Sequence, residues 1–547
     1  MTAVAERGPA TPAPPPPAGP RVASRVLTAL AAAVVLLALV APDQLGQYTP
    51  AALLRLPVEA LVGAALLLVL PVRAGRVVAL AAGALLGVLT LVRALDIGFM
   101  TALARRFDPV FDWSQLGAAG TFLTSSIGPV GATAAAVVLV VLAVGAVVLL
   151  ALAARRLAGV VVRHRRATAR AVPVLAVVWV VCAVLGTQVA PPVPVAARGA
   201  AAQLVRTLVQ VPTSIADHRA FLDQAAAPDP FAADAAPLEA LRGKDVVLVY
   251  VESYGRTALE DPASPVGAAL DEGADRLASA GFGARSGWLT SPVAGGGSWL
   301  AHATLMSGLR VSNQQSYRDL VASDRLTLTG AFRRAGWETT GVMPGVLSEW
   351  PESRFWGVDR VHGSDALGNR SREFVDFRTP DQFTLSAFER LEHGRPDRGP
   401  LMAEVPLVTS HYPWTPVPRT VPWDEVGDGT VYDTMPGAPD EAVWSDPTRI
   451  RAAYQESIAY SLESLMSWVQ TYGDDDLVVV FLGDHQPSPV VTGAGAGHDV
   501  PVTVVARDPA VLDRAAAWGW STGPAPAPAA PVWPMDDFRD RFLAAFD

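Results

Sequence analysis

Cysteine and lysine are nearly absent from this chain: its 547 residues include one cysteine, Cys182, and one lysine, Lys244. The lone cysteine lies inside an apolar run, so a disulfide scaffold, a Cys-ligated zinc site and CxxC redox chemistry are excluded. Charged residues are also scarce, at 17%, whereas apolar residues reach 51%. This composition is too apolar for a disordered or wholly soluble protein, and it predicts membrane segments. Frequent arginine and alanine are typical of GC-rich bacteria.

The few charges are divided unevenly along the chain. Residues 1–200 carry 16 basic and 6 acidic side chains, whereas residues 201–547 carry 27 basic and 46 acidic ones. Two different physical environments therefore share one chain. The acidic excess of the second part argues against nucleic-acid binding, and against broad electrostatic attraction to any other anionic polymer.

Long apolar runs are confined to the first 190 residues. Residues 1–20 are rich in Pro and Ala without apolar periodicity, which predicts a disordered cytoplasmic tail. Five runs follow, each near the ~20 residues that a helix needs to cross the hydrocarbon: 22–41, 52–71, 75–95, 131–154 and 171–190. We therefore predict a five-span membrane domain over residues 21–190. A cleaved signal peptide is the alternative for the first run, although that run is long and further spans follow it.

Arginines flank the predicted spans unequally. With a cytoplasmic N-terminus, 11 of the 16 basic residues of the first part lie at inner ends of spans, as the positive-inside rule requires. An odd number of spans then places everything after about residue 190 outside the cytoplasm of a bacterial cell. Residues 191–240 are predicted to be a linker. Part of it, with Leu204, Leu208, Val211 and Ile215 in partial helical period, is expected to form an amphipathic helix.

Residues 241–547 have the pattern of an α/β domain. Short β-branched runs alternate with helical stretches and Gly turns, which predicts a largely parallel central sheet. The clearest strands are 245–251, 405–408, 477–482 and 500–506. Ligands of such sheets bind just beyond the carboxyl ends of the strands, so the residues at those ends are the first candidates for a site.

Candidate metal ligands or proton-transfer groups follow three of these strands. Glu252 follows the first strand, His411 lies three residues after the second, and Asp484 with His485 follows the third. Any one of them alone could be an ordinary loop cap, but three together favour a site. A carboxylate and an imidazole in sequence can supply two ligands to one Zn²⁺ or Mn²⁺ ion, with Mg²⁺ as a further option.

Ser298 is the candidate nucleophile. It follows three glycines and opens a predicted helix through Met306, whose N-terminus would face an anion such as phosphate. Serine needs a metal or base for activation, and a metal held by the strand-end ligands and by Ser298 itself would serve. The alternative is that Ser298 only caps the helix. Thr290, Ser291 and Ser307 are the competing hydroxyls, and none of them combines the glycine run with a helix start.

These motifs resemble those of the alkaline phosphatase/sulfatase superfamily. The membrane half followed by an outer catalytic domain resembles the lipoteichoic acid synthases and related phosphoglycerol transferases. By this resemblance, Glu252, Asp484 and His485 match the family's metal ligands, and Ser298 stands where the family has its threonine nucleophile. His411, in TSHYPW, matches a histidine that the family uses at the substrate.

Further residues are assigned to the substrate. The resemblance implies a role for His498, which precedes the last strand, while His302 lies one helical turn after Ser298 and either touches substrate or packs under the site. The phosphoglycerol transferases carry Trp and Arg two residues apart, whereas Trp350 and Arg354 are four apart here. This departure weakens a glycerol-phosphate assignment but not phosphoryl transfer. The C/S-x-P-x-R motif that sulfatases need is absent around Ser298, so sulfate ester hydrolysis is not expected.

The resemblance implies a membrane-bound, metal-dependent transferase with a phosphoseryl intermediate. Its donor would be a phospholipid head group, and its acceptor an envelope polymer or a second lipid, with His411 as candidate general acid or base. A hydrolase, in which water replaces the acceptor, uses the same nucleophile and metal and stays open as an alternative. A noncatalytic envelope scaffold or regulator that binds phosphate-containing polymer is the alternative from another class.

Overall fold

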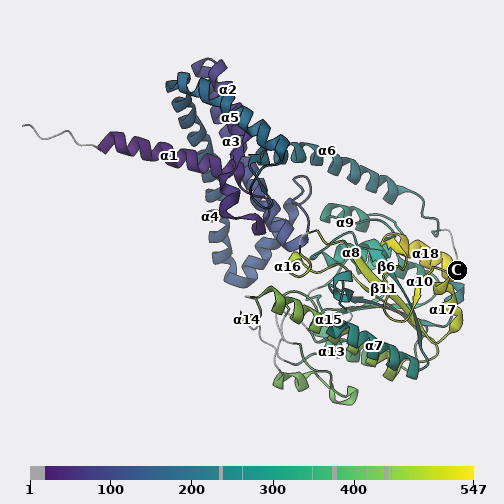
Figure 1. Cartoon of the computed structure of the whole chain (residues 1–547). Coiled ribbons are helices and arrows are strands. Elements are labelled where there is room, and N and C mark those ends of the chain that lie inside the picture. The colour runs from purple at the N-terminus through teal and green to yellow at the C-terminus, as the bar shows by residue number, and fades with distance from the viewer. Residues whose placement is uncertain are drawn as a thin grey trace, which may run out of the picture. The chain divides into compact units, whose positions relative to one another are not determined.

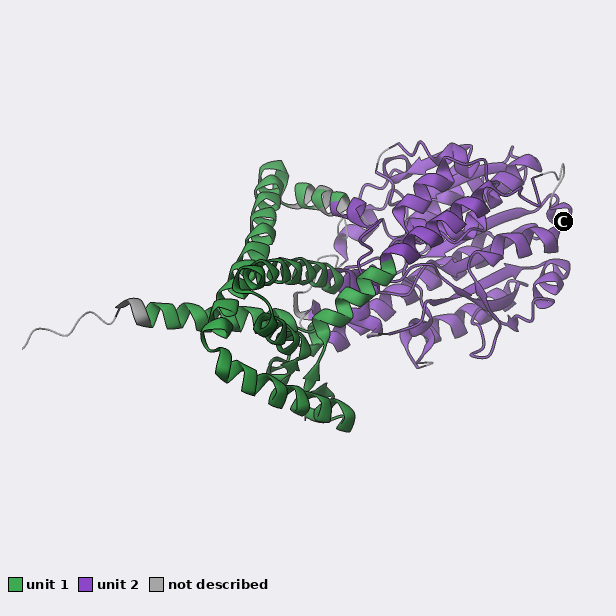
Figure 2. Cartoon of the chain, turned by 90° about the horizontal axis from the view of Figure 1, so that it is seen from above, with its two compact units in different colours: residues 1–97, 117–210 green, residues 98–116, 211–547 purple. Residues whose placement is uncertain are grey.

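The chain forms two compact units, which Figure 2 shows in different colours. We call residues 1–97 and 117–210 the membrane unit, and residues 98–116 and 211–547 the α/β unit. The computed structural model describes residues 19–232, 238–261, 263–347, 349–371, 379–414, 417–435, 441–444, 446–493 and 495–547. The predicted disordered tail, residues 1–20, lies outside the described residues except for its last two, which begin α1 (Gly19–Val40).

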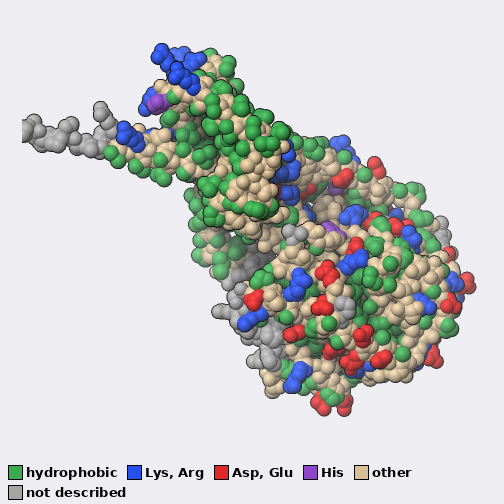
Figure 3. Space-filling view, viewed as in Figure 1, with side chains coloured by type: hydrophobic (Ala, Val, Ile, Leu, Met, Phe, Trp, Pro, Cys, Tyr) green, Lys and Arg blue, Asp and Glu red, His purple; other side chains and the backbone are tan. Residues whose placement is uncertain are grey.

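Apolar helices build the membrane unit, and many hydrophobic side chains lie on the face of it that Figure 3 shows. After α1 come α2 (Val58–Val69), α3 (Val72–Leu103), α4 (Trp113–Arg163) and α5 (Arg165–Leu185). Within the described residues, four stretches are long and apolar enough to cross a membrane: Val22–Val40, Val72–Leu103, Ile127–Arg163 and Arg165–Leu185. Four of the five predicted runs thus form helices of spanning length.

The remaining predicted run, 52–71, contains the shorter helix α2. Arg165 at the start of α5 donates a 2.8 Å hydrogen bond to the carbonyl oxygen of Leu68 near the end of α2. Before α2, strand β1 (Leu56–Pro57) pairs with β4 (Ala196–Ala197), which follows α5. Residues 56–69 therefore run alongside α5 in the opposite direction. Because a 12-residue helix is only about 18 Å long, a crossing here needs the flanking residues as well.

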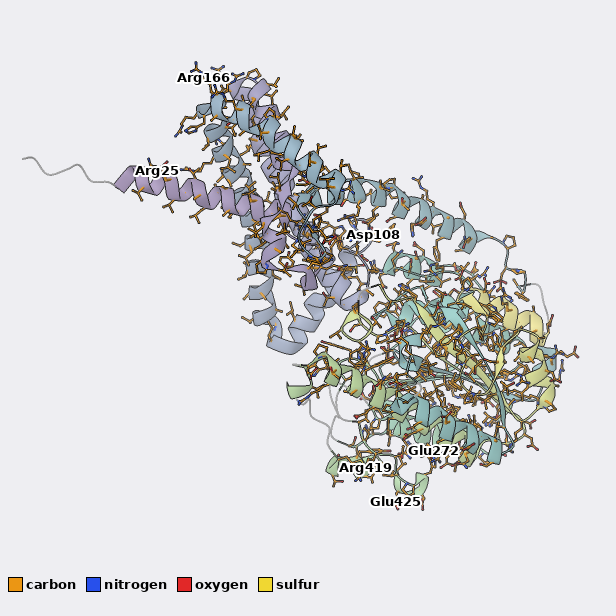
Figure 4. The ribbon with its side chains drawn as sticks, viewed as in Figure 1. Arg25, Asp108, Arg166, Glu272, Arg419 and Glu425 are labelled. Atoms are coloured by element: carbon orange, nitrogen blue, oxygen red, sulfur yellow. The ribbon has the colours of Figure 1, made fainter. Side chains whose placement is uncertain are left out.

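Basic side chains gather where α4 meets α5. Arg163, His164, Arg165 and Arg166 are consecutive there, and Figure 3 shows a patch of basic atoms at this place; Arg166 is labelled in Figure 4. Arg156 of α4 donates to the carbonyl oxygen of Ser24, which brings the start of α1 to the same end of the membrane unit. These are among the arginines on which the predicted orientation depends.

The predicted linker, residues 191–240, contains one long helix, α6 (Gly199–Ala226). Its first part belongs to the membrane unit and its second part to the α/β unit, because the units divide between residues 210 and 211. Leu208 and Val209 are exposed on it, at 64% and 60%. Such exposed apolar side chains are those that an amphipathic helix presents to a lipid surface.

A nine-stranded sheet forms the centre of the α/β unit. Across the sheet the strands are β12 (Ser521–Thr522), β6 (Gly283–Thr290), β11 (Asp499–Ala506), β10 (Leu477–Gly483), β5 (Asp245–Val251), β9 (Leu401–Leu407), β7 (Glu338–Met343) and β8 (Arg360–Gly363), with β13 (Val532–Pro534) paired to β6. Strands β10, β5, β9, β7 and β8 are mutually parallel, and β11 is antiparallel to its neighbours. The predicted fold class is therefore confirmed.

Helices cover both faces of this sheet (Figure 1). One face packs on α7 (Pro265–Ser279), α13 (Asp381–Phe388) and α15 (Pro447–Tyr472), and the other on α8 (Ser298–Ser307), α10 (Leu328–Arg334), α17 (Pro509–Ala516) and α18 (Asp537–Phe546). The other helices are α9 (Gln314–Val321), α11 (Ser353–Trp356), α12 (Ser364–Leu367), α14 (Glu441–Trp444) and α16 (Pro489–Thr492). Alternate residues of β5 face opposite sides of the sheet. Leu248 packs in the core that contains α8 and α10, whereas Val247 and Val249 pack in the core that contains α7 and α15. Each such buried side chain contributes roughly 1.5–3 kcal/mol of transfer free energy.

Candidate active site

The main site residues follow the carboxyl ends of two adjacent parallel strands. Glu252 comes directly after β5, and Asp484 and His485 come directly after β10. The register pairs Val251 with Gly483, so the residues that follow them emerge side by side. All three site side chains are buried, with exposed fractions of 7% for Glu252, 0% for Asp484 and 1% for His485.

The ligand atoms of these three residues converge. The Nε2 atom of His485 lies 3.3 Å from Oε1 of Glu252 and 3.6 Å from Oδ2 of Asp484. His485 donates from Nδ1 to the Gln486 carbonyl oxygen at 2.8 Å, which directs the lone pair of Nε2 toward the carboxylates. Asp484 Oδ1 is fixed by the backbone N–H groups of Ser253, at 2.8 Å, and of His485, at 2.7 Å.

The charge of this cluster fits a divalent cation. Among the described residues, Asp484 Oδ2 is buried without a hydrogen-bond partner, and two carboxylates face one imidazole within 4.8 Å. Burial, followed by the Glu252 charge, raises the pKa of Asp484 above its usual range. Burial also acts to raise the pKa of Glu252, but the nearby imidazoles of His485 and His411 and hydrogen bonds, including that from Ser298, together lower that pKa. A bound cation would relieve this conflict, since hard oxygen and borderline nitrogen ligands suit Mn²⁺, Zn²⁺ or Mg²⁺.

Ser298 faces the same cluster from the first residue of α8. Its Oγ donates a 2.8 Å hydrogen bond to Oε2 of Glu252 and lies 3.3 Å from Nε2 of His485. Gly295, Gly296 and Gly297 precede it with φ angles of 75°, 151° and 88°, a region that favours glycine. The N-cap of α8 is Gly297, not Ser298. The alternative in which Ser298 merely caps the helix is therefore wrong.

The competing hydroxyls are engaged elsewhere. Ser291 is buried and donates to the carbonyl oxygen of Asp484 at 2.7 Å, and Thr290 donates to Oδ1 of Asp499 at 2.9 Å. Ser307 donates to the Ala303 carbonyl oxygen at 2.6 Å, within its own helix. Of the four hydroxyls considered from sequence, Ser298 is the one that meets the ligand cluster.

A pocket of about 310 Å³ opens beside Ser298 and Glu252. His302, Trp350 and His411, three of the predicted site residues, line this pocket. His411 is exposed in the loop after β9.

Two other residues assigned to the substrate lie apart from this pocket. Arg354 is exposed on α11 and is not among the residues that line it. His498 does not line it either; its Nδ1 lies 3.2 Å from the Ser291 carbonyl oxygen.

The same pocket contains residues that the sequence analysis did not select. Glu404, in the middle of β9, lines it together with Tyr317 and Trp356. Glu404 Oε1 lies 3.7 Å from Nδ1 of His302, whose ring stacks on Tyr250 with centroids 3.6 Å apart. An acidic residue within an otherwise apolar strand is a signal for Glu404, but the predicted strand began one residue later, at 405.

Comparisons with known proteins support the suspected superfamily. Residues 244–501 match the family model described as Sulfatase. No curated protein matches the chain in sequence.

Several solved structures are similar to the chain. The lipoteichoic acid synthase LtaP of Listeria monocytogenes shares 15% identity over 59% of this chain and 76% of its own, with a TM-score of 0.37. The Streptococcus pyogenes phosphoglycerol transferase GacH shares 12% sequence identity over 60% of this chain and 78% of its own, with a TM-score of 0.36. The periplasmic domain of the Campylobacter jejuni phosphoethanolamine transferase EptC shares 13% sequence identity over 55% of this chain and 89% of its own, with a TM-score of 0.35.

Proposed function

We propose that this protein is a metal-dependent transferase that uses Ser298 to move a phospho-alcohol group, in line with the match of residues 244–501 to the Sulfatase family model. One observation carries the proposal. The Ser298 hydroxyl, at the start of a helix, lies 2.8 Å from a Glu252 oxygen and 3.3 Å from the His485 imidazole. A nucleophile, its activating groups and a helix N-terminus for the phosphoryl oxygens are thus in one place.

The four residues Glu252, Ser298, Asp484 and His485 would hold one divalent cation, Mn²⁺ or Zn²⁺ before Mg²⁺. When bound, the cation would lower the pKa of the Ser298 hydroxyl and offset negative charge on the phosphoryl oxygens. The backbone N–H groups at the start of α8 add further stabilisation of the same charge. Asp484 and Glu252 are held in place by hydrogen bonds from Ser253, so the ligands are oriented before the substrate arrives.

The donor in this proposal is a phosphodiester in a lipid head group. Ser298 gives its proton to water, and its Oγ forms a bond to phosphorus while the bond from phosphorus to the diacylglycerol oxygen breaks in line. His411 protonates the departing oxygen, leaving phosphoserine with the head-group alcohol still attached. An acceptor hydroxyl then gives its proton to His411 and attacks phosphorus, and Ser298 Oγ departs and is reprotonated from water.

The acceptor is the step at which a transferase differs from a hydrolase. We propose an envelope polymer or lipid hydroxyl, because the membrane helices keep the enzyme among lipid donors and lipid-linked acceptors, which raises their effective concentration. A phosphodiesterase with water as acceptor would share every earlier step. Product analysis with and without an added lipid alcohol separates the two activities.

The proposed substrates require the α/β unit to lie outside the cytoplasm. Residues 56–69 run alongside α5 from the β1–β4 pair to Arg165, which supports a fifth crossing. The arginine distribution supports a cytoplasmic position for the connection between α4 and α5. Reporter fusions after residues 73, 115, 163 and 240 should read inside, outside, inside and outside. A cytoplasmic signal at residue 240 would remove the lipid and envelope substrates from reach.

The direct test of the nucleophile is intact-mass measurement of the full chain, purified in detergent and incubated with phospholipid. We expect an added head-group phosphate on the wild-type protein and none on Ser298→Ala. That variant should keep its fold, because Gly297 rather than Ser298 caps the helix. Ser307→Ala, on the same helix, is the matched control and should still form the adduct. An adduct that persists in Ser298→Ala would refute the proposal.

A further inference from the structure

The pocket beside Ser298 extends below the carboxyl ends of the strands. Glu404 pairs in register with Leu248, four residues before Glu252, so the Cα atom of Glu404 lies about 13 Å deeper along the sheet. His302 is one helical turn, about 6 Å, from Ser298 on α8 and lies 3.7 Å from the Glu404 carboxylate. The Glu404 carboxylate therefore lies beside His302, a residue one helical turn from Ser298, in the same pocket.

Glu404 is a buried carboxylic acid without a compensating partner. It is 4% exposed and lines the pocket, and the described residues show no side-chain hydrogen bond to its carboxylate. Burial raises the pKa of Glu404 to about 7. Burial also lowers the pKa of His302 to about 3, so this neighbour is neutral and cannot offset a negative charge. Because an unpaired buried carboxylate is costly, its partner is expected to come with a ligand.

The walls around Glu404 favour a cation over a neutral polyol. Tyr317, Trp350 and Trp356 line the pocket with Met306 and Met343, and no Lys or Arg is found among its described lining residues. Aromatic faces attract an ammonium group, and a carboxylate completes its coordination. A neutral polyol would gain no comparable charge-based attraction from the ring faces or the carboxylate.

We propose that Glu404 determines specificity for a head group that carries a protonated primary amine, as in 2-aminoethyl phosphate. This inference rests on the proposed function, since Ser298 must bind the phosphorus of the same head group. The phosphorus then lies at the Ser298 end of the pocket, and the ammonium nitrogen lies between the Glu404 carboxylate and the aromatic side chains. Ser298 and Glu404 line the same pocket, so one head group can contact both.

The test compares two donors that differ at the amine, which is charged in one and N-acetylated and neutral in the other. Full-length protein in detergent is given phosphatidylethanolamine or its N-acetylated form with the same acyl chains, and the rate of adduct formation gives kcat/KM for each. We expect the wild-type protein to favour the free amine by about tenfold or more. Glu404→Gln, which keeps the shape but not the charge, should lower this ratio by about the same factor. Glu272→Gln, on the exposed face of α7 (Figure 4), is the control and should leave both rates unchanged.

Each outcome decides a different point. Equal rates with the two donors, or an unchanged ratio in Glu404→Gln, would overturn the inference and leave the proposed function standing. No adduct from either donor, nor from an activated nitrophenyl phosphodiester, would refute the proposed function and this inference with it. If Glu404→Gln shows no cooperative thermal transition, equal wild-type rates with the two donors would still overturn the inference, because that comparison needs no variant.

Discussion

The two ends of the substrate pocket differ in how their charged side chains are partnered. At the Ser298 end, two carboxylates and an imidazole lie within 4.8 Å of one another, and Ser298 and backbone N–H groups hold them in fixed positions. At the Glu404 end, one buried carboxylate faces a neutral imidazole and aromatic rings. The first arrangement suits a cation that stays with the protein, and the second suits a cation that arrives with each substrate. Substitutions at the Ser298 end should therefore change the reaction rate, whereas substitutions at the Glu404 end should change the selectivity for the donor head group.

The largest effect is expected from Asp484→Ala, which removes a ligand from the Ser298 end. Metal content should fall to a small fraction of the wild-type value, and turnover should fall roughly a thousandfold or more, since a bound metal supplies several kcal/mol of transition-state stabilisation. Elemental analysis of protein purified without chelator, together with a donor assay, measures both. Full metal content in Asp484→Ala would contradict the proposed ligand set.

A smaller loss is expected from His411→Ala. Removal of a general acid typically costs about 10²–10⁴-fold in rate, but only when the leaving group needs a proton. We expect a loss in this range with a phospholipid donor and a much smaller loss with a nitrophenyl phosphodiester, whose leaving group departs as an anion. Equal losses with both donors would exclude His411 as the acid and assign it to substrate binding.

The contrast between the two ends also shows what the sequence could predict. Glu252, Asp484 and His485 follow apolar strands directly, so their convergence followed from the rule that parallel strands end at one edge. Glu404 lies inside a strand, and no local pattern shows which face of a strand opens into a pocket. Strand β6 was missed because Gly283–Thr290 has no β-branched run and depends on its pairing with β11. Tertiary contacts decide such strands, as they often override local propensity.

The smallest effect concerns stability at the Glu404 end. The folded state holds the Glu404 proton up to a pKa of about 7, whereas the unfolded chain releases it near 4.5, so this group makes folding less favourable as pH rises between those values. We therefore expect the free energy of unfolding of Glu404→Gln, relative to that of the wild-type protein, to be up to about 3 kcal/mol higher at pH 8 than at pH 4.5. Thermal unfolding at both pH values, followed by tryptophan fluorescence, measures this difference. A relative stability that does not change with pH would show that the carboxylate is solvated.

One experiment tests directly whether a bound metal is needed for Ser298 to act as the nucleophile. Full-length protein is stripped with chelator, incubated with phospholipid with or without added Mn²⁺, and mapped by peptide mass spectrometry. We expect a phospho-alcohol adduct on Ser298 in the sample with metal and no adduct in the sample without it. An adduct formed without metal, an adduct on any other residue, or no adduct in either sample would contradict a metal-activated Ser298.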